Sequence, residues 1–336
     1  MQRDPYKFRF LIFLGILVWA IACPIIWVSL FYTNFNGDLT RIGQWREADF
    51  YPQITQDTYL EKPKIYESLA SADILVIGDS FSEGRVWQSF VESPRFSLAT
   101  LTWSQIGEVC ADFVKKIREA GFSGKTIIIE SVERLTVESI EKSINCASGK
   151  KSIPSASTFR HTSKTNEKKP DGPNLSGQYW VGIKVLFHSA AIRLIKSYYK
   201  LHNWKSKGTH VYPIDNGCDF FSNRMCDYGL FYYEDYHRPA PNIETINKIK
   251  KIDDNLKDYR VIWLIIPNKS SIYQKATDHS FWERLESSKL GPNLYTMFEN
   301  KKIKIRDLYK PNDSHLSIDG YRYLSRIVLK ELEEEN

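Results

Sequence analysis

The feature that most constrains this chain is an uncharged run of 23 residues near its N-terminus, at residues 10–32. A helix of this length rises about 35 Å, more than the ~30 Å hydrocarbon core of a bilayer. Arg3, Lys7 and Arg9 precede the run, whereas the flank beyond it is mixed in charge. The run therefore predicts one membrane-spanning helix, with residues 1–9 as a cytoplasmic tail and the rest of the chain outside the cytoplasmic membrane.

A cleaved signal sequence is the alternative interpretation of this run. Ala20-Ile21-Ala22-Cys23 resembles a lipoprotein cleavage site. The apolar region of a signal sequence is usually about 7–15 residues long. Here the apolar run continues well past Cys23 to Phe31, so we favour a retained anchor, in which Pro24 is tolerated.

The cysteines are few for a protein of an oxidising compartment. There are five in 336 residues, so the fold does not depend on a framework of disulfides. Cys23 lies in the membrane-spanning run, while Cys218 and Cys226 flank a short loop that a disulfide would close. Two free thiols are the alternative. The sequence has no metal-binding spacing of Cys or His, so we expect neither a metal nor a cofactor.

Buried strands alternate with helices along much of the chain, which predicts an α/β fold with a parallel sheet. Apolar runs predict strands at residues 73–78, 96–100, 125–132 and 261–267, with a short further one at 302–308. Helical periodicity predicts helices at residues 80–91, 104–120, 179–204 and 321–333. In the helix at 179–204, the charges of Lys184, Arg193 and Lys196 exclude a second membrane span.

The chain divides into a juxtamembrane segment, residues 33–70, and one domain, residues 71–336. Residues 147–177 are rich in Ser, Lys, Thr, Pro and Gly and predict a flexible basic insertion. Aromatic residues with Gly and Asp predict a hairpin-like excursion at residues 209–238. The insertion carries a net charge of +4 and the first nine residues +2, which together equal the formal +6 of the chain. No basic stripe remains for nucleic acid, so we expect no nucleic-acid partner.

A serine follows the first strand of the predicted sheet, in Gly78-Asp79-Ser80-Phe81-Ser82. Side chains at the carboxyl end of such a strand face the crevice where ligands bind. The backbone N–H of Ser80 would lie near a helix N-terminus, where it can stabilise an oxyanion. Serine is a weak nucleophile without a base, and Asp or Ser before a helix is more often a cap. A catalytic role for Ser80 therefore requires a histidine.

That histidine occurs near the C-terminus, in Asn312-Asp313-Ser314-His315-Leu316-Ser317. Asp313 and His315 are two residues apart, so in extended backbone the carboxylate can orient the imidazole. Ser80, His315 and Asp313 then supply the nucleophile, base and orienting acid of a catalytic triad. A solvated turn capped by Asp313 is the alternative. The two motifs, at opposite ends of a parallel α/β pattern, together favour catalysis.

The motifs Ile77-Gly-Asp-Ser-Phe81 and Asp313-Ser-His-Leu-Ser317 resemble the first and last sequence blocks of the SGNH (GDSL-type) hydrolases. The Asp-x-His spacing is more similar to the branch of membrane-linked polysaccharide O-acetyltransferases, which includes the alginate acetylation proteins. Three further segments resemble that branch, namely residues 37–43, 130–134 and 266–273. The resemblance implies an SGNH-hydrolase-like (flavodoxin-like) parallel sheet flanked by helices, and a serine acyl-enzyme.

The chain departs from simple SGNH esterases where those enzymes complete their oxyanion site. They use a Gly and an Asn from two further blocks, and neither is found in the corresponding segments, so only the Ser80 N–H is an assured donor. Four residues after predicted strands are expected at the same sheet edge, to complete the oxyanion site or to bind a sugar: Arg134, Asn268, Lys269 and Tyr273. An ion pair between Glu130 and Arg134, and loop packing of Lys269 and Tyr273, are the alternatives.

Triad and resemblance together predict a membrane-anchored O-acyltransferase, which moves acetyl to sugar hydroxyls of a bacterial surface polysaccharide in the periplasm. A carbohydrate esterase of the same fold and a non-catalytic polysaccharide-binding or scaffold protein are the alternatives. CoA is not expected outside the membrane. As the resemblance implies, a transferase would need a multispanning membrane protein to deliver the acyl group.

Overall fold

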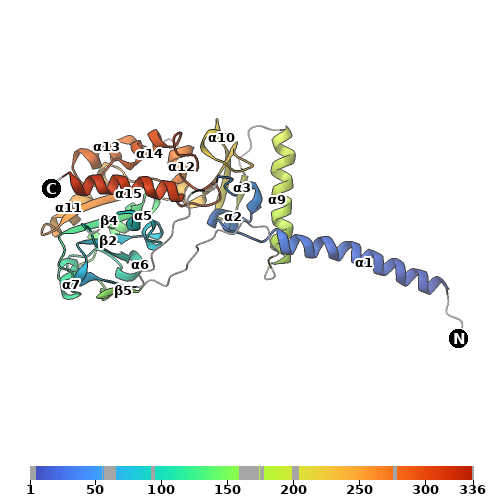
Figure 1. Cartoon of the computed structure of the whole chain (residues 1–336), viewed down its shortest axis with the longest axis horizontal. Helices are drawn as coiled ribbons and strands as arrows, with labels where there is room; N and C mark the ends of the chain where they lie inside the picture. Colours follow the sequence, from blue (N-terminus) through green and yellow to red (C-terminus); the bar gives the residue numbers. More distant parts are fainter. Residues whose placement is uncertain are drawn as a thin grey trace.

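The computed structural model describes residues 5–54, 56, 66–91, 95–158, 174, 178–198, 204–274 and 278–334. The first helix, α1 (Pro5–Phe31), extends away from the rest of the molecule, and most of its side chains are exposed (Figure 1). Its apolar length is sufficient to cross a membrane, and Pro24 lies within it. One N-terminal apolar helix therefore precedes an α/β domain, as the sequence predicts.

A parallel sheet of four strands forms the centre of that domain. Its strands, in spatial order, are β3 (Leu98–Thr102), β2 (Ile74–Gly78), β4 (Thr126–Val132) and β9 (Arg260–Ile266). All five residues of β2 and of β3 are buried. Such continuous apolar strands are typical of parallel sheets with both faces covered. The predicted α/β class with a parallel sheet is confirmed.

Helices cover this sheet (Figure 1). They are α4 (Ser80–Glu83), α5 (Val86–Val91), α6 (Trp103–Ile106), α7 (Phe113–Glu119), α8 (Glu133–Ile144), α11 (Ile243–Asn255), α12 (Lys269–Tyr273), α13 (His279–Ser287), α14 (Leu294–Lys301) and α15 (Ile318–Glu333). The C-terminal α15 packs on α5, and α11 packs on both α8 and α13. These contacts bring the end of the chain back to the first strand of the sheet.

Three predicted elements are wrong in part. The helix at 80–91 is divided because Arg85 adopts a φ of 54°, and the helix at 104–120 is divided at Gly107, with a φ of 78°. Residues 302–308 alternate like a strand but form turns instead. There Asp307 has a φ of 58°, and its N–H donates to the Phe220 carbonyl at 2.7 Å.

A second, smaller unit joins the juxtamembrane segment to the predicted excursion. Its elements are α2 (Asp38–Gly43), α3 (Glu47–Phe50), α9 (Tyr179–Tyr198), α10 (Gly217–Phe220), the antiparallel strands β6 (Trp204–Ser206), β7 (Thr209–Pro213) and β8 (Tyr228–Tyr232), and the 3-10 helix η2 (Tyr233–Tyr236). Leu39, Trp45 and Phe50 share a small core with Ile192 and Leu230. The juxtamembrane segment is therefore folded onto the domain rather than separate from it.

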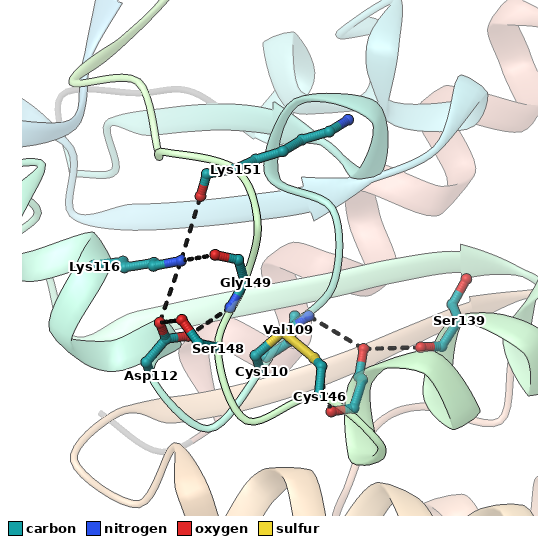
Figure 2. Close-up of a disulfide and its surroundings, with 10 residues drawn as sticks. Val109, Cys110, Asp112, Lys116, Ser139, Cys146, Ser148, Gly149 and Lys151 are labelled. Carbon is teal, nitrogen blue, oxygen red and sulfur yellow. Dashed lines mark hydrogen bonds and ion pairs between the residues drawn. A yellow bond between two sulfur atoms is a disulfide. The ribbon is translucent and has the colours of Figure 1, made fainter.

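Two disulfides lie within the described residues. One joins Cys218 to Cys226, the pair suggested by the sequence. The other joins Cys110 to Cys146, which the sequence analysis did not pair (Figure 2). Close to it, Lys116 donates a hydrogen bond to the Gly149 carbonyl and forms an ion pair with Asp112 at 3.2 Å (Figure 2).

The start of the predicted basic insertion is therefore fixed to α7. Further along, β5 (Ala156–Thr158) pairs antiparallel with β1 (Tyr66–Ser68), which leads into the 3-10 helix η1 (Leu69–Ser71). Most of the insertion, residues 159–173 and 175–177, lies outside the described residues.

Candidate active site

Ser80 lies at the point where the strand order of the sheet reverses. Strand β2, the first of the sheet along the chain, is flanked by β3 on one side and β4 on the other. Ligands of open α/β folds bind outside the carboxyl ends of the strands at such a point. Asp79 caps the short helix that follows, because its carboxylate accepts the Phe81 N–H at 3.0 Å. The cap leaves the exposed Ser80 at the first position of α4.

His315 brings the two ends of the domain together. Its Nε2 lies 2.8 Å from Ser80 Oγ, and its Nδ1 lies 2.7 Å from Asp313 Oδ1. The same carboxylate oxygen accepts the backbone N–H of His315 at 3.0 Å, which fixes the two side chains relative to each other. The three side chains are thus hydrogen-bonded in the order that the sequence analysis expects of a nucleophile, a base and an orienting acid.

The loop that carries Asp313 and His315, residues 309–316, is itself tightly closed. Tyr309 and Leu316 form an isolated antiparallel bridge, and the Lys310 N–H donates to the His315 carbonyl at 3.1 Å. We call this segment the Asp-His loop. The ring of Phe81 packs 4.8 Å from the ring of His315, centroid to centroid. The closed Asp-His loop and the Phe81 ring therefore hold the imidazole of His315 in place.

Asp38 is a site residue that the sequence analysis missed. Its carboxylate accepts hydrogen bonds from the backbone N–H of Ser314, at 2.8 Å, and from the Ser314 hydroxyl. The backbone N–H of Asp38 in turn donates to Asp313 at 3.3 Å. A Cβ on Gly37 would lie 2.0 Å from the Asn312 carbonyl oxygen, so only glycine permits this approach. The segment just past the anchor thus packs directly on the Asp-His loop.

The pKa values of the two carboxylates beside His315, Asp38 and Asp313, are shifted in opposite directions. Burial raises the pKa of Asp38 to about 6, and the nearby charge of Asp313 adds to the shift. Burial also acts to raise the pKa of Asp313, but the hydrogen bond to His315 and the charge of its ring outweigh burial and hold that pKa well below its usual range. Asp313 is therefore the permanent anion of the pair.

The pKa of His315 is raised above its ordinary value. Burial acts to lower it, but the hydrogen bond to Asp313 and the charges of Asp313 and Asp38 outweigh burial. The positive charge of Arg134 opposes the shift. This combination makes His315 a stronger base than free imidazole.

Glu130 supports the turn that presents Ser80. Its Oε2 accepts the Asp79 N–H at 3.0 Å and the Ser82 hydroxyl at 2.7 Å. A Cβ on Gly78 would lie 2.5 Å from the same oxygen, so the turn requires glycine there. Burial, together with the charge of Asp79, raises the pKa of Glu130 well above its ordinary value. Glu130 thus lies beneath the turn that carries Ser80, and among the described residues the ion pair of Arg134 is with Asp235 instead.

Lys269 occupies a different place from the one expected. Its side chain is buried, and Nζ donates to the carbonyl oxygens of Lys310, Pro311 and Asp313 at 2.7, 2.9 and 3.1 Å. An ammonium group has three donors, and all three are occupied. Lys269 therefore positions the Asp-His loop, and the predicted role in binding an oxyanion or a sugar is wrong for it.

Arg134 and Asn268 lie together at the carboxyl ends of β4 and β9. The Asn268 side-chain oxygen accepts the backbone N–H of Arg134 at 3.3 Å, and the guanidinium forms an ion pair with Asp235 at 3.4 Å. The guanidinium carbon also lies over the Tyr232 ring, 5.1 Å from its centroid and so within the ~6 Å of a cation–π contact. Arg134 thus belongs to the sheet edge that holds the triad.

Tyr273 is a core residue rather than a site residue. Its ring packs 4.6 Å from Phe221 and 5.7 Å from Phe220, and its exposed fraction is 8%. Burial raises the pKa of its hydroxyl above the ordinary value. The loop-packing alternative therefore describes Tyr273, and the predicted contact with substrate is wrong.

One group of side chains at the site has the composition of a metal site. Asp38, Asp313 and His315 place one ligand atom each within 4.8 Å of the others. However, Nδ1 of His315 already contacts Asp313, and Nε2 contacts Ser80. In this arrangement both ring nitrogens are engaged in the triad, and neither is directed at a shared ion.

Comparison with protein-family models, with curated proteins and with solved structures finds no match to the chain. The chemical interpretation of the site therefore rests on its geometry. Ser80, His315 and Asp313 form a continuous hydrogen-bonded series at the switch point of a parallel sheet. This series can activate a hydroxyl for attack on an acyl carbon.

Proposed function

We propose that the protein is a membrane-anchored, SGNH-type O-acyltransferase that acts outside the cytoplasmic membrane. The observation that carries the proposal is the 2.8 Å contact between Ser80 Oγ and His315 Nε2, with Asp313 on the other ring nitrogen. The proposed donor is an acyl ester, most simply an acetyl ester, and the proposed acceptor is a sugar hydroxyl of a surface polysaccharide.

In the first half-reaction His315 Nε2 takes the proton from Ser80 Oγ while Oγ attacks the acyl carbon. The tetrahedral intermediate collapses when His315 returns that proton to the leaving oxygen, which breaks the bond to the donor and leaves Ser80 acylated. Asp313 holds the ring in the required tautomer and stabilises the imidazolium that forms. Its lowered pKa suits this role because the carboxylate stays charged.

The oxyanion of the intermediate would be stabilised by the backbone N–H of Ser80. Within the described residues this N–H makes no hydrogen bond, since the Asp79 carboxylate takes the Phe81 N–H instead. Preorganised donors of this kind contribute about 3–4 kcal/mol each to acyl transfer. Arg134 is the proposed second polar contact for the substrate, because its charge acts on His315 from the same sheet edge.

In the second half-reaction His315 takes a proton from the acceptor hydroxyl, which attacks the acyl carbon, and returns that proton to Ser80 Oγ as the bond from Oγ to the acyl group breaks. With water as the acceptor, the same residues make an esterase. The exposure of Ser80 favours this second candidate, because water can reach the acyl group. Transfer to sugar would require the bound polysaccharide to exclude water. A multispanning membrane protein is the proposed source of acyl groups.

The proposal is tested in the cells that make the protein, by measuring acetylation of their surface polysaccharide. We expect Ser80→Ala and a deletion of the gene to lose acetylation equally, with Ser97→Ala as the matched control. Ser97 lies at the amino end of the sheet, where its hydroxyl binds Asp73. Normal acetylation in Ser80→Ala but not in the deletion strain would instead support the scaffold alternative. Increased acetylation in both would support the esterase.

A further inference from the structure

The helix α9 has two faces of different character. Gly182, Val185, Ser189 and Ile192 lie on one face and are buried. The opposite face carries three large apolar side chains spaced seven residues apart, and seven residues bring a helix back to nearly the same direction. These are Trp180, Phe187 and Leu194, with exposed fractions of 71%, 70% and 71%. Nothing in the described part of the chain covers this outer face.

Helix α9 lies next to the C-terminal end of α1. The two helices cross, with α9 lying across the direction in which α1 extends (Figure 1). A Cβ on Gly182 would lie 2.6 Å from the Val28 carbonyl oxygen, so the two backbones are in contact there. Val28 is about 5 Å before the end of α1 at 1.5 Å per residue. If α1 spans a membrane, α9 therefore starts at the membrane surface.

The inner face of α9 is attached to the juxtamembrane helices. Asp49 accepts a hydrogen bond from Ser189 at 2.7 Å and forms an ion pair with Arg193 at 2.6 Å. His188 Nδ1 lies 3.0 Å from the Gln44 carbonyl oxygen. Because this face is attached to α2 and α3, the outer face is directed away from the domain, towards the side on which α1 extends.

The basic residues of α9 suit binding to an anionic membrane surface. The helix contains Lys184, Arg193 and Lys196 and no acidic residue. Lys184 is exposed one turn from Trp180. Helices with Trp, Phe and Leu on one face and basic residues beside it are typical of the membrane interface. Trp27 of α1 is 59% exposed near the same level, as in the aromatic belts of membrane proteins.

We propose that the outer face of α9 lies in the headgroup region of the outer leaflet and holds the domain against the membrane. The proposal rests on the membrane span of α1 and is independent of the chemistry at Ser80. It gives the site a fixed orientation, because His188 of α9 contacts Gln44 at the end of α2, and Asp38 begins that helix. Ser80 would then lie at a fixed distance from the membrane surface at which acyl groups are delivered.

The test uses the full chain, with Cys23→Ser, in vesicles of phosphatidylethanolamine and phosphatidylglycerol. Single cysteines are introduced as Phe187→Cys, Leu194→Cys and the control Lys115→Cys, and each is labelled with a nitrobenzoxadiazole fluorophore. These side chains are exposed, so the labels leave the fold intact. Lys115 belongs to α7, at the opposite end of the molecule from α9 (Figure 1).

We expect spin-labelled (doxyl) lipid to quench the fluorophores at positions 187 and 194 and to leave position 115 unchanged. Water-soluble iodide should quench in the reverse order. If positions 187 and 194 behave like position 115, the face is open to water and the proposal is wrong. If they are shielded from iodide and also from doxyl lipid, a second copy of the chain covers the face and the proposal is equally wrong.

Discussion

The Asp38 carboxylate lies 3.6 Å from Nδ1 of His315, although 277 positions of sequence separate the two residues. Asp38 begins the first short helix after α1, whereas His315 belongs to the last loop before the C-terminal helix. The contact makes the juxtamembrane segment part of the candidate active site. It also gives His315 a second negative neighbour besides Asp313.

We predict that Asp38→Asn lowers the pKa of His315, because it removes one of the charges that raise it. The acidic limb of the pH profile for acyl transfer should therefore move to lower pH than in the wild type. Loss of the charged acceptor of Ser314 should also destabilise the fold by about 1–3 kcal/mol. The control is Asp319→Asn, the same change at a half-buried carboxylate that pairs with Arg322 away from His315. If the acidic limb of the pH profile for Asp38→Asn lies where that of the wild type does, the assigned role of Asp38 is wrong.

If Ser80 is acylated as proposed, the wild-type protein should lose this activity as the pH falls through the pKa of His315, which lies above the ordinary 6.5. The base must be neutral to accept the Ser80 proton, so the rate rises with pH through this value. Asp313→Asn should reduce the rate of acylation by roughly 10³–10⁴-fold, because the ring loses its orienting anion. Steady-state rates with an acetyl ester measure both effects. A variant with near-normal rate would exclude Asp313 from the triad.

Lys269 should make the stability of the protein depend on pH. Burial lowers its pKa from 10.5 to about 7, so between these values the unfolded chain binds more protons than the folded one. Stability therefore increases as the pH rises from about 7 towards 10.5 and decreases as it falls back. Lys269→Met lacks this dependence. The difference in thermal unfolding temperature, wild type minus variant, should grow with pH across this window, and a constant difference would refute the assignment.

The two disulfides should stabilise the fold unequally. Cys110 and Cys146 are separated by 36 positions, and Cys218 and Cys226 by 8. From loop-closure entropy, the first contributes roughly 4 kcal/mol and the second roughly 2.5 kcal/mol. The double variant Cys110→Ser/Cys146→Ser should therefore unfold at a lower temperature than Cys218→Ser/Cys226→Ser. The reverse order in thermal unfolding would be inconsistent with this expectation.

The sequence was sufficient for the features that depend on short stretches of chain. Ser80 follows an apolar strand directly, and Asp313 and His315 lie two residues apart, so the parallel α/β pattern and the pairing of Asp313 with His315 could be predicted from local pattern. Asp38 could not be found in this way, because its partner Ser314 is 276 residues away. Residues 37–43 resemble a segment of the acetyltransferase branch, but no local signal in the sequence indicates which loop they contact.

The residues whose roles were predicted incorrectly are those whose side chains are buried in the structure. Lys269 and Tyr273 follow a strand just as Asn268 does, and the sequence does not distinguish side chains directed at the crevice from those directed into the core. The structure places the Lys269 amine under the Asp-His loop and the Tyr273 ring among Phe220 and Phe221. Residues 302–308 alternate like a strand, but turns replace it because contacts with α10 govern that segment.

The central claim is that Ser80 becomes acylated through His315. The most direct test is to incubate the purified full chain with p-nitrophenyl acetate, quench it, and locate acetyl groups by peptide mass spectrometry. We expect acetyl on Ser80 in the wild type and in Ser97→Ala, and none at this position in His315→Ala. Absence of the Ser80 adduct from the wild type, together with unchanged ester turnover by Ser80→Ala, would contradict the claim.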